Sequence, residues 1–85
     1  MSVIYYRLVL FQRSGVTHTV RFDDLQISVP DFIRLVKQQE IRRLHNYCEC
    51  ELRIRNVATS YVYNNEEIIP RNSTVIATRI YHFPE

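Results

Sequence analysis

The segment ISVPDFIRLVKQQ, residues 27–39, constrains the fold of this chain more than any other stretch. Its apolar residues recur at the i, i+3, i+4 and i+7 spacing of one helix face: Val29, Phe32, Ile33 and Val36. Ser28 is placed to act as the N-cap, and Pro30 falls in the first turn, where a missing amide costs nothing. The spacing predicts a helix that ends between residues 39 and 44. Because such a stripe must be buried, the rest of the chain has to supply a surface for it.

The segments before the helix predict a β-hairpin. VIYYRLVLFQ, residues 3–12, alternates apolar side chains between two faces, and THTVRF, residues 17–22, returns with Val20 and Phe22 inward. The turn is expected in RSGV, residues 13–16, because it holds the only glycine of the chain. The DDLQ stretch, residues 23–26, is predicted to be a loop.

The segments after the helix predict two further strands and a short one. CELRIRN, residues 50–56, and TVIATRIY, residues 74–81, both alternate, the first with Cys50, Leu52 and Ile54 inward. A short strand or turn is expected near residues 61–63. The adjacent isoleucines Ile68 and Ile69 are expected to anchor the intervening loop to the core.

This order of elements predicts an α+β fold of the β-grasp (ubiquitin-like) type, with one main helix packed across a mixed sheet of four to five strands. A ferredoxin-like fold would need a second helix, and residues 56–73 are too polar and too interrupted to form one. An OB barrel would need five long strands. The 85 residues are expected to form a single domain, residues 1–85, in a reducing compartment, because the two cysteines stand one residue apart and no secretory segment is present.

Four stretches also resemble a known family. They are VRFDDLQISVPDF, ECELRIRN, the Thr59-to-Tyr63 spacing and IIPRNSTVIATRI. Together they span nearly the whole chain and are similar to the DWNN domain ("domain with no name"). This ubiquitin-like domain is found at the N-terminus of retinoblastoma-binding-protein-type RING ubiquitin ligases and in subunits of the cleavage and polyadenylation factor.

The resemblance implies a non-catalytic protein-docking domain. It implies a nuclear protein that continues into a zinc knuckle and a RING finger, with any ubiquitin-ligase activity in that RING. Its implied partners are protein subunits of the pre-mRNA 3′-end processing machinery, including the endonuclease subunit. Since the sequence ends in YHFPE without a di-glycine, we expect a binding domain rather than a conjugated modifier.

The resemblance to ubiquitin also predicts the surface that would bind the partner. The residues that alternate outward are expected to share one sheet face: Tyr5, Arg7, Val9, Arg53, Arg55, Ile76 and Thr78. Ten of the eleven basic residues of the chain are arginine, whose planar fork suits carboxylate, phosphate and aromatic partners. A face that mixes arginine with aromatic and aliphatic side chains fits a protein partner that carries carboxylates.

Alternative functions remain open at the level of sequence. An RNA-binding module could use these residues: Arg42, Arg43, Arg53, Arg55, Arg71, Arg79, Tyr5, Tyr61 and Tyr81. Acidic residues interleave with the arginines and the net charge is only +2, which favours a protein partner instead. A free-standing ubiquitin-like protein that interacts with the ubiquitin-ligase machinery is a further alternative.

Catalytic and metal chemistry have little support in the sequence. His45, Cys48 and Cys50 have one residue between the cysteines, where structural zinc sites usually have two, and His82 is distant. The serines stand in no nucleophile motif and the paired carboxylates of residues 23–24 and 66–67 lie in polar loops. We therefore expect no catalytic residue, no metal, no cofactor, no small-molecule substrate and no membrane partner.

Overall fold

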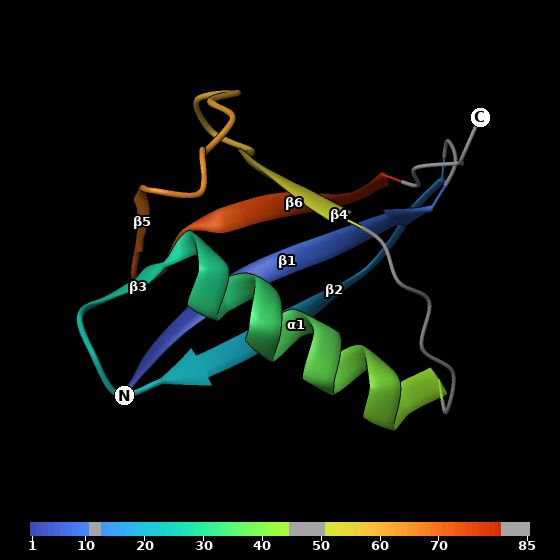
Figure 1. Cartoon of the computed structure of the whole chain (residues 1–85), viewed down its shortest axis with the longest axis horizontal. Coiled ribbons are helices and arrows are strands. Elements are labelled where there is room, and N and C mark those ends of the chain that lie inside the picture. The colour runs from blue at the N-terminus through green and yellow to red at the C-terminus, as the bar shows by residue number, and fades with distance from the viewer. Residues whose placement is uncertain (11–12, 45–50, 81–85) are drawn as a thin grey trace.

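The computed structural model describes residues 1–10, 13–44 and 51–80. In this part of the chain the elements follow the order β1 (Ser2–Leu10), β2 (Arg13–Phe22), β3 (Gln26–Ser28), α1 (Val29–Leu44), β4 (Glu51–Asn56), β5 (Ile68–Pro70) and β6 (Thr74–Ile80). Helix α1 lies across one face of the large sheet, and the short strands β3 and β5 lie near its N-terminal end (Figure 1).

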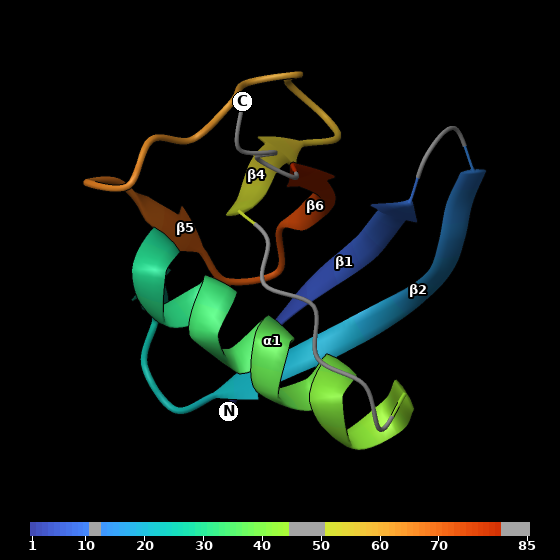
Figure 2. The same ribbon diagram turned by 45° about the vertical axis from the view of Figure 1, so that its right-hand side comes forward.

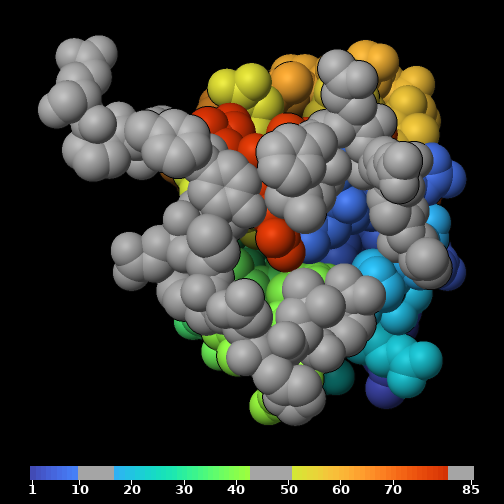
Figure 3. Space-filling model, turned by 90° about the vertical axis from the view of Figure 1, so that its right-hand side faces the viewer, coloured from blue at the N-terminus to red at the C-terminus, as the bar shows by residue number. Residues whose placement is uncertain are grey.

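The main sheet is mixed and has the strand order β2-β1-β6-β4. Strand β1 pairs antiparallel with β2 and parallel with β6, and β6 pairs antiparallel with β4. The sheet curves around the helix, which occupies its concave side (Figure 2). Seen from the end where β6 finishes, atoms of β6 lie beside those of β1, with atoms of α1 along one side (Figure 3). This is the predicted β-grasp fold, with the second sheet β3-β5 added.

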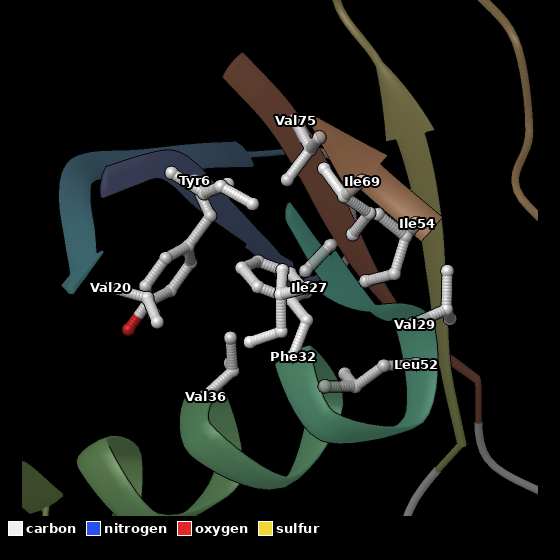
Figure 4. Packing of buried hydrophobic residues seen from close by; sticks show 12 residues of the cluster. Tyr6, Val20, Ile27, Val29, Phe32, Val36, Leu52, Ile54, Ile69 and Val75 are labelled. Carbon is white, nitrogen blue, oxygen red and sulfur yellow. The ribbon is translucent and has the colours of Figure 1, made fainter. Parts of the chain in front are cut away.

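Alternation along the strands places one apolar set against the helix. Among the described residues the core contains twelve buried hydrophobic side chains: Ile4, Tyr6, Val20, Ile27, Val29, Phe32, Val36, Leu52, Ile54, Ile69, Val75 and Ala77. Phe32 lies at its centre, fully buried, with its ring edge-on to Tyr6 at a centroid distance of 6.1 Å (Figure 4). Burying side chains of this size supplies most of the stability of a domain as small as this.

The helix begins as the sequence predicts. The Ser28 hydroxyl accepts a hydrogen bond from the Asp31 amide at 3.3 Å, as an N-cap side chain does. Val29, Phe32 and Val36 are buried and Ile33 packs partly buried against the core. The helix ends at Leu44, the last residue of the predicted interval.

The expected position of the hairpin turn was wrong. Residues 13–16 belong to β2 rather than to a turn, and the two residues that join β1 to β2 lie outside the described part of the chain. Gly15 does not have a positive φ. Instead, Arg7 pairs with Thr17 and Val9 pairs with Ser14. Two steps along β1 therefore correspond to three steps along β2. The extra residue lies at Gly15–Val16, so the glycine marks a β-bulge, as glycine inside a strand often does.

The region around β3 and β5 also differs from the prediction. Gln26 was expected in a loop, but Gln26–Ser28 pairs with Ile68–Pro70 as a small antiparallel sheet. Ile69 is fully buried as predicted, whereas Ile68 is 47% exposed and does not anchor the loop. The reason is that both isoleucines lie in one strand, so their side chains point to opposite faces. Cys50, predicted to face inward, lies outside the described residues.

Candidate partner-binding surface

The seven residues predicted to share a face come from three adjacent strands of the main sheet. In β1, Tyr5 and Arg7 are exposed and Val9 is partly so, while the neighbouring Ile4 and Tyr6 are buried. The same alternation leaves Arg53 and Arg55 exposed in β4 and Ile76 and Thr78 partly exposed in β6. Since the helix covers the other face, this set lies on the uncovered face of the sheet, and we call it the arginine face.

The strand register sets the order of side chains across the arginine face. Arg7 pairs with Ile76, which pairs with Arg55 on its other side. In the next row, Val9 pairs with Thr78, which pairs with Arg53. Because neighbouring strands are about 4.8 Å apart, each row is a compact strip about 10 Å wide. An isoleucine flanked by two guanidinium groups can contact an apolar side chain while both arginines meet carboxylates.

The arginines of this face are available to a partner. Arg7 is steadied within the sheet, because its Nε donates a hydrogen bond to the Thr17 hydroxyl at 3.1 Å. Among the described residues the one ion pair joins Arg34 to Asp31 on the helix. Glu51 precedes Arg53 by two residues on the same side of β4, so the face carries both signs of charge with arginine in excess.

The loop that follows β4 contains the short extended segment that the sequence predicts near residues 61–63, reduced to a single bridge residue. Val62 forms an isolated bridge with Arg55, so the loop folds back along the outer edge of β4. The Asn56 side chain organises its start, since its oxygen accepts hydrogen bonds from the amides of Ala58 and Thr59, at 2.9 and 3.1 Å. Its amide nitrogen donates to the Tyr63 hydroxyl at 3.0 Å.

The other end of this loop is held by Glu67. The Tyr61 hydroxyl lies 2.8 and 2.7 Å from the two carboxylate oxygens of Glu67 and donates to them. The hydrogen bond to the carboxylate raises the pKa of Tyr61 above its ordinary value, with smaller contributions from desolvation and from the negative charge of Glu67. The Tyr61 ring is half exposed and stacks edge-on against Tyr63 at 5.4 Å. An acidic residue that sequence analysis placed in a polar loop is therefore a structural acceptor.

The arginines considered for RNA binding do not form one surface. Arg42 is exposed on α1 and Arg71 is exposed in the turn after β5, while Arg53 and Arg55 lie on the arginine face. Arg79 pairs with Leu52 and is partly buried on the side of β6 that faces the helix. Tyr81 lies outside the described residues. Within the described part of the chain, the RNA-binding candidates that lie on the arginine face are therefore Tyr5, Arg53 and Arg55.

Neither a group of potential metal ligands nor a helix that could span a membrane occurs among the residues that the structure describes. Among these residues no three histidine, cysteine, aspartate or glutamate side chains come together as metal ligands would. The zinc candidates His45, Cys48, Cys50 and His82 are outside the described residues. No described helix is both long and apolar enough to span a lipid bilayer.

A single helix laid across a mixed β2-β1-β6-β4 sheet, with a small second sheet at the start of the helix, defines a ubiquitin-like β-grasp domain. The chain belongs to the DWNN domain family, whose family model matches residues 4–81, nearly the whole sequence. The DWNN domain is a ubiquitin-like domain, a class that is generally non-catalytic. A comparison with curated proteins found no match.

Proposed function

We propose that this chain is a protein-docking domain that uses the arginine face to bind a protein subunit of the pre-mRNA 3′-end processing machinery, the endonuclease subunit in particular. The observation that carries the proposal is the Arg7–Ile76–Arg55 row, an apolar side chain between two arginines on the sheet face that the helix leaves uncovered. Membership of the DWNN family supports the choice of partner.

The chemistry of this face fits an acidic segment of the partner. Arginine binds carboxylates through paired hydrogen bonds and is enriched among the residues that dominate protein interfaces. Tyr5, 38% exposed, adds an aromatic side chain beside Thr74 and Thr19 in the same sheet. A rigid sheet presents these groups in a fixed spacing, so little conformational entropy is lost on binding.

In this proposal the domain holds the rest of a longer protein in place and catalyses no reaction itself. It works in the nucleus as the docking part of a longer protein. The zinc knuckle and RING finger of that longer protein lie outside these 85 residues. Any ubiquitin-ligase activity belongs to that RING. The domain would then hold the longer protein on the processing complex and so promote cleavage and polyadenylation.

The experiment compares two charge reversals of equal size. The purified domain and its Arg53→Glu/Arg55→Glu variant are used to recover proteins from nuclear extract, and binding to the purified endonuclease subunit is measured by calorimetry. The Arg42→Glu/Arg71→Glu variant is the matched control, because both arginines are exposed and neither belongs to the arginine face. We expect at least tenfold weaker binding for the first variant and less than twofold for the control.

Two results would contradict the proposal. If both variants bind the endonuclease subunit as tightly as the original domain, the arginine face is not the docking surface. If the subunit does not bind at all, the partner is wrong.

RNA binding is the second candidate, because Tyr5 lies on the same face as Arg53 and Arg55. It would appear as binding to single-stranded RNA that weakens steeply between 50 and 200 mM salt, on the order of 10³-fold for six phosphate contacts.

A further inference from the structure

A second surface lies at the other side of the molecule, near the start of the helix. A hollow of about 680 Å³ opens between the segment that joins β2 to β3, the first turns of α1, and β5. None of the residues of the arginine face lines it. We call it the acidic groove and define it by these residues: Phe22, Asp24, Leu25, Asp31, Leu35 and Ile68.

Apolar side chains line both the floor and the rim of the groove. Phe22 and Leu35 are partly buried side chains packed against the core, and they form its floor. Leu25 is 70% exposed and Ile68 is 47% exposed, although both are aliphatic. They come from segments far apart in the sequence and line the same hollow. Covering two such side chains would remove apolar area from water, which favours a bound partner.

The groove is held open by backbone hydrogen bonds, so a ligand would find it already formed. The Leu25 carbonyl accepts a hydrogen bond from the Arg71 amide at 3.3 Å, which ties the segment before β3 to the turn after β5. Ile68 is fixed by the pairing of β5 with β3, where it stands opposite Ser28. The Val29 amide donates to the Glu67 carbonyl at 3.1 Å and fastens the residue that precedes β5 to the helix start. A pre-formed site loses little entropy on binding.

The charge of the groove is opposite to that of the arginine face. Asp24 and Asp31 carry two negative charges in its lining, and Arg34 carries one positive charge, which leaves a net charge of −1. Arg34 lies 3.2 Å from Asp31 and is already paired with it. Exposed Asp23 directly precedes Asp24 in the chain, just as exposed Arg21 directly precedes Phe22. The lining of the hollow is thus net negative, with Asp24 as the carboxylate that forms no ion pair among the described residues, in a chain whose formal net charge is +2.

We propose that the acidic groove binds a short basic segment of a partner protein, which inserts one apolar side chain between Leu25 and Ile68. Lysine or arginine residues on either side of that anchor meet Asp23 and Asp24. The complementary charge selects the segment and the buried anchor supplies most of the affinity. The site is independent of the arginine face, so the domain can hold two partners at once.

The test selects ligands without assuming their sequence. A phage-displayed library of random twelve-residue peptides is selected on the domain and counter-selected on the Leu25→Ser/Ile68→Ser variant. We expect an enriched pattern of one large apolar residue flanked by lysine or arginine. A synthetic peptide with that pattern should bind the variant at least tenfold more weakly, and should shift the amide NMR signals of Leu25, Leu35 and Ile68.

Matched controls separate this site from others. Val57→Ser/Val62→Ser removes two aliphatic side chains of 42% and 47% exposure from outside the groove and should change the Kd less than twofold. Asp24→Lys should weaken binding at least threefold. Arg53→Glu/Arg55→Glu should bind the peptide as the original domain does, so that failure of the arginine face and failure of the groove are distinguishable.

Three outcomes would overturn the proposal. The first is an enriched pattern that is acidic or has no apolar anchor, or no enrichment at all. The second is equal binding of the selected peptide to the Leu25→Ser/Ile68→Ser variant, with circular dichroism showing that the variant is folded. The third is a concentration-dependent dimer in sedimentation equilibrium that this variant abolishes, because a second copy of the chain would then be the occupant.

Discussion

Tyr5 and Tyr6 are neighbours in β1, yet their side chains lie on opposite faces of the sheet. Tyr6 is fully buried against the helix, whereas Tyr5 is 38% exposed on the arginine face. The same contrast separates Ile54 from Arg55 in β4 and Ala77 from Ile76 in β6. The two faces thus use alternate residues of the same strands: one set is buried against the helix, and the other points outward on the face where we propose that a partner binds.

The two faces also handle polar groups differently. On the buried face the Tyr6 hydroxyl donates to a carboxylate oxygen of Glu40 at 3.0 Å and accepts from the Gln39 amide at 2.9 Å. Glu40 is only 6% exposed, so this network is enclosed by the helix and the sheet. On the arginine face the polar groups meet solvent. Substitutions on the buried face should therefore change stability, and substitutions on the arginine face should change binding.

The largest effect is expected at the centre of the core. Phe32→Ala should lower the free energy of unfolding by about 3–5 kcal/mol, because it leaves a cavity between the helix and the sheet. Urea denaturation followed by circular dichroism measures this. The control is Ile41→Ala on the same helix, where the side chain is 40% exposed. Equal effects of the two substitutions would show that the helix does not cover the sheet as described.

The adjacent tyrosines give the sharpest comparison. Tyr6→Phe removes the hydroxyl that bonds to buried Glu40 and should cost about 1–3 kcal/mol of unfolding free energy. Tyr5→Phe removes an exposed hydroxyl and should change it by less than about 0.5 kcal/mol. Urea denaturation of both variants at pH 7 tests the difference. A Tyr5→Phe variant as unstable as Tyr6→Phe would break the distinction between the two faces.

The helix that covers the buried face can be weakened at its end. Ser28→Ala removes the acceptor for the Asp31 amide and should cost about 1 kcal/mol. Ser28→Asp keeps an acceptor oxygen and should retain most of the stability. Thermal unfolding of the two variants measures the effect, and identical melting temperatures for both would count against the cap.

The smallest change in stability is expected on the arginine face. Arg53→Gln/Arg55→Gln should shift the free energy of unfolding by no more than about 0.5 kcal/mol, because both side chains are exposed and carry no ion pair among the described residues. The same variant should lose binding to the endonuclease subunit. A large loss of stability would mean that these arginines support the fold, and binding data from the charge reversal would then need a different explanation.

Much of the fold could be predicted from the sequence because its signals are local. The stripe Val29, Phe32 and Val36 has the period of a helix, and Ser28 stands where an N-cap belongs. Alternation in β4 and β6 correctly separated Leu52 and Ile54 from Arg53 and Arg55, and Val75 from Ile76. The membership of the arginine face followed from this alternation, while its role in binding stays a prediction.

Other features depended on contacts between distant residues. The pairing of Gln26–Ser28 with Ile68–Pro70 joins segments about forty residues apart in sequence, and neither is long enough to show an alternating pattern alone. The bulge at Gly15–Val16 was mistaken for a turn, because a glycine signals both and only the strand register distinguishes them. The hydrogen bond of Tyr61 to Glu67 likewise depends on how the loop after β4 closes.

The sequence by itself determined the helix, the alternating strands and the side chains that each strand turns toward solvent, since each depends on neighbours within one turn or one pleat. Only the tertiary structure decided which strands are adjacent, and therefore that Ile76 lies between Arg7 and Arg55 and that Leu25 and Ile68 meet at one groove. The physical reason is that strand order and groove shape arise from long-range hydrogen bonds and packing, whose partners no local pattern specifies.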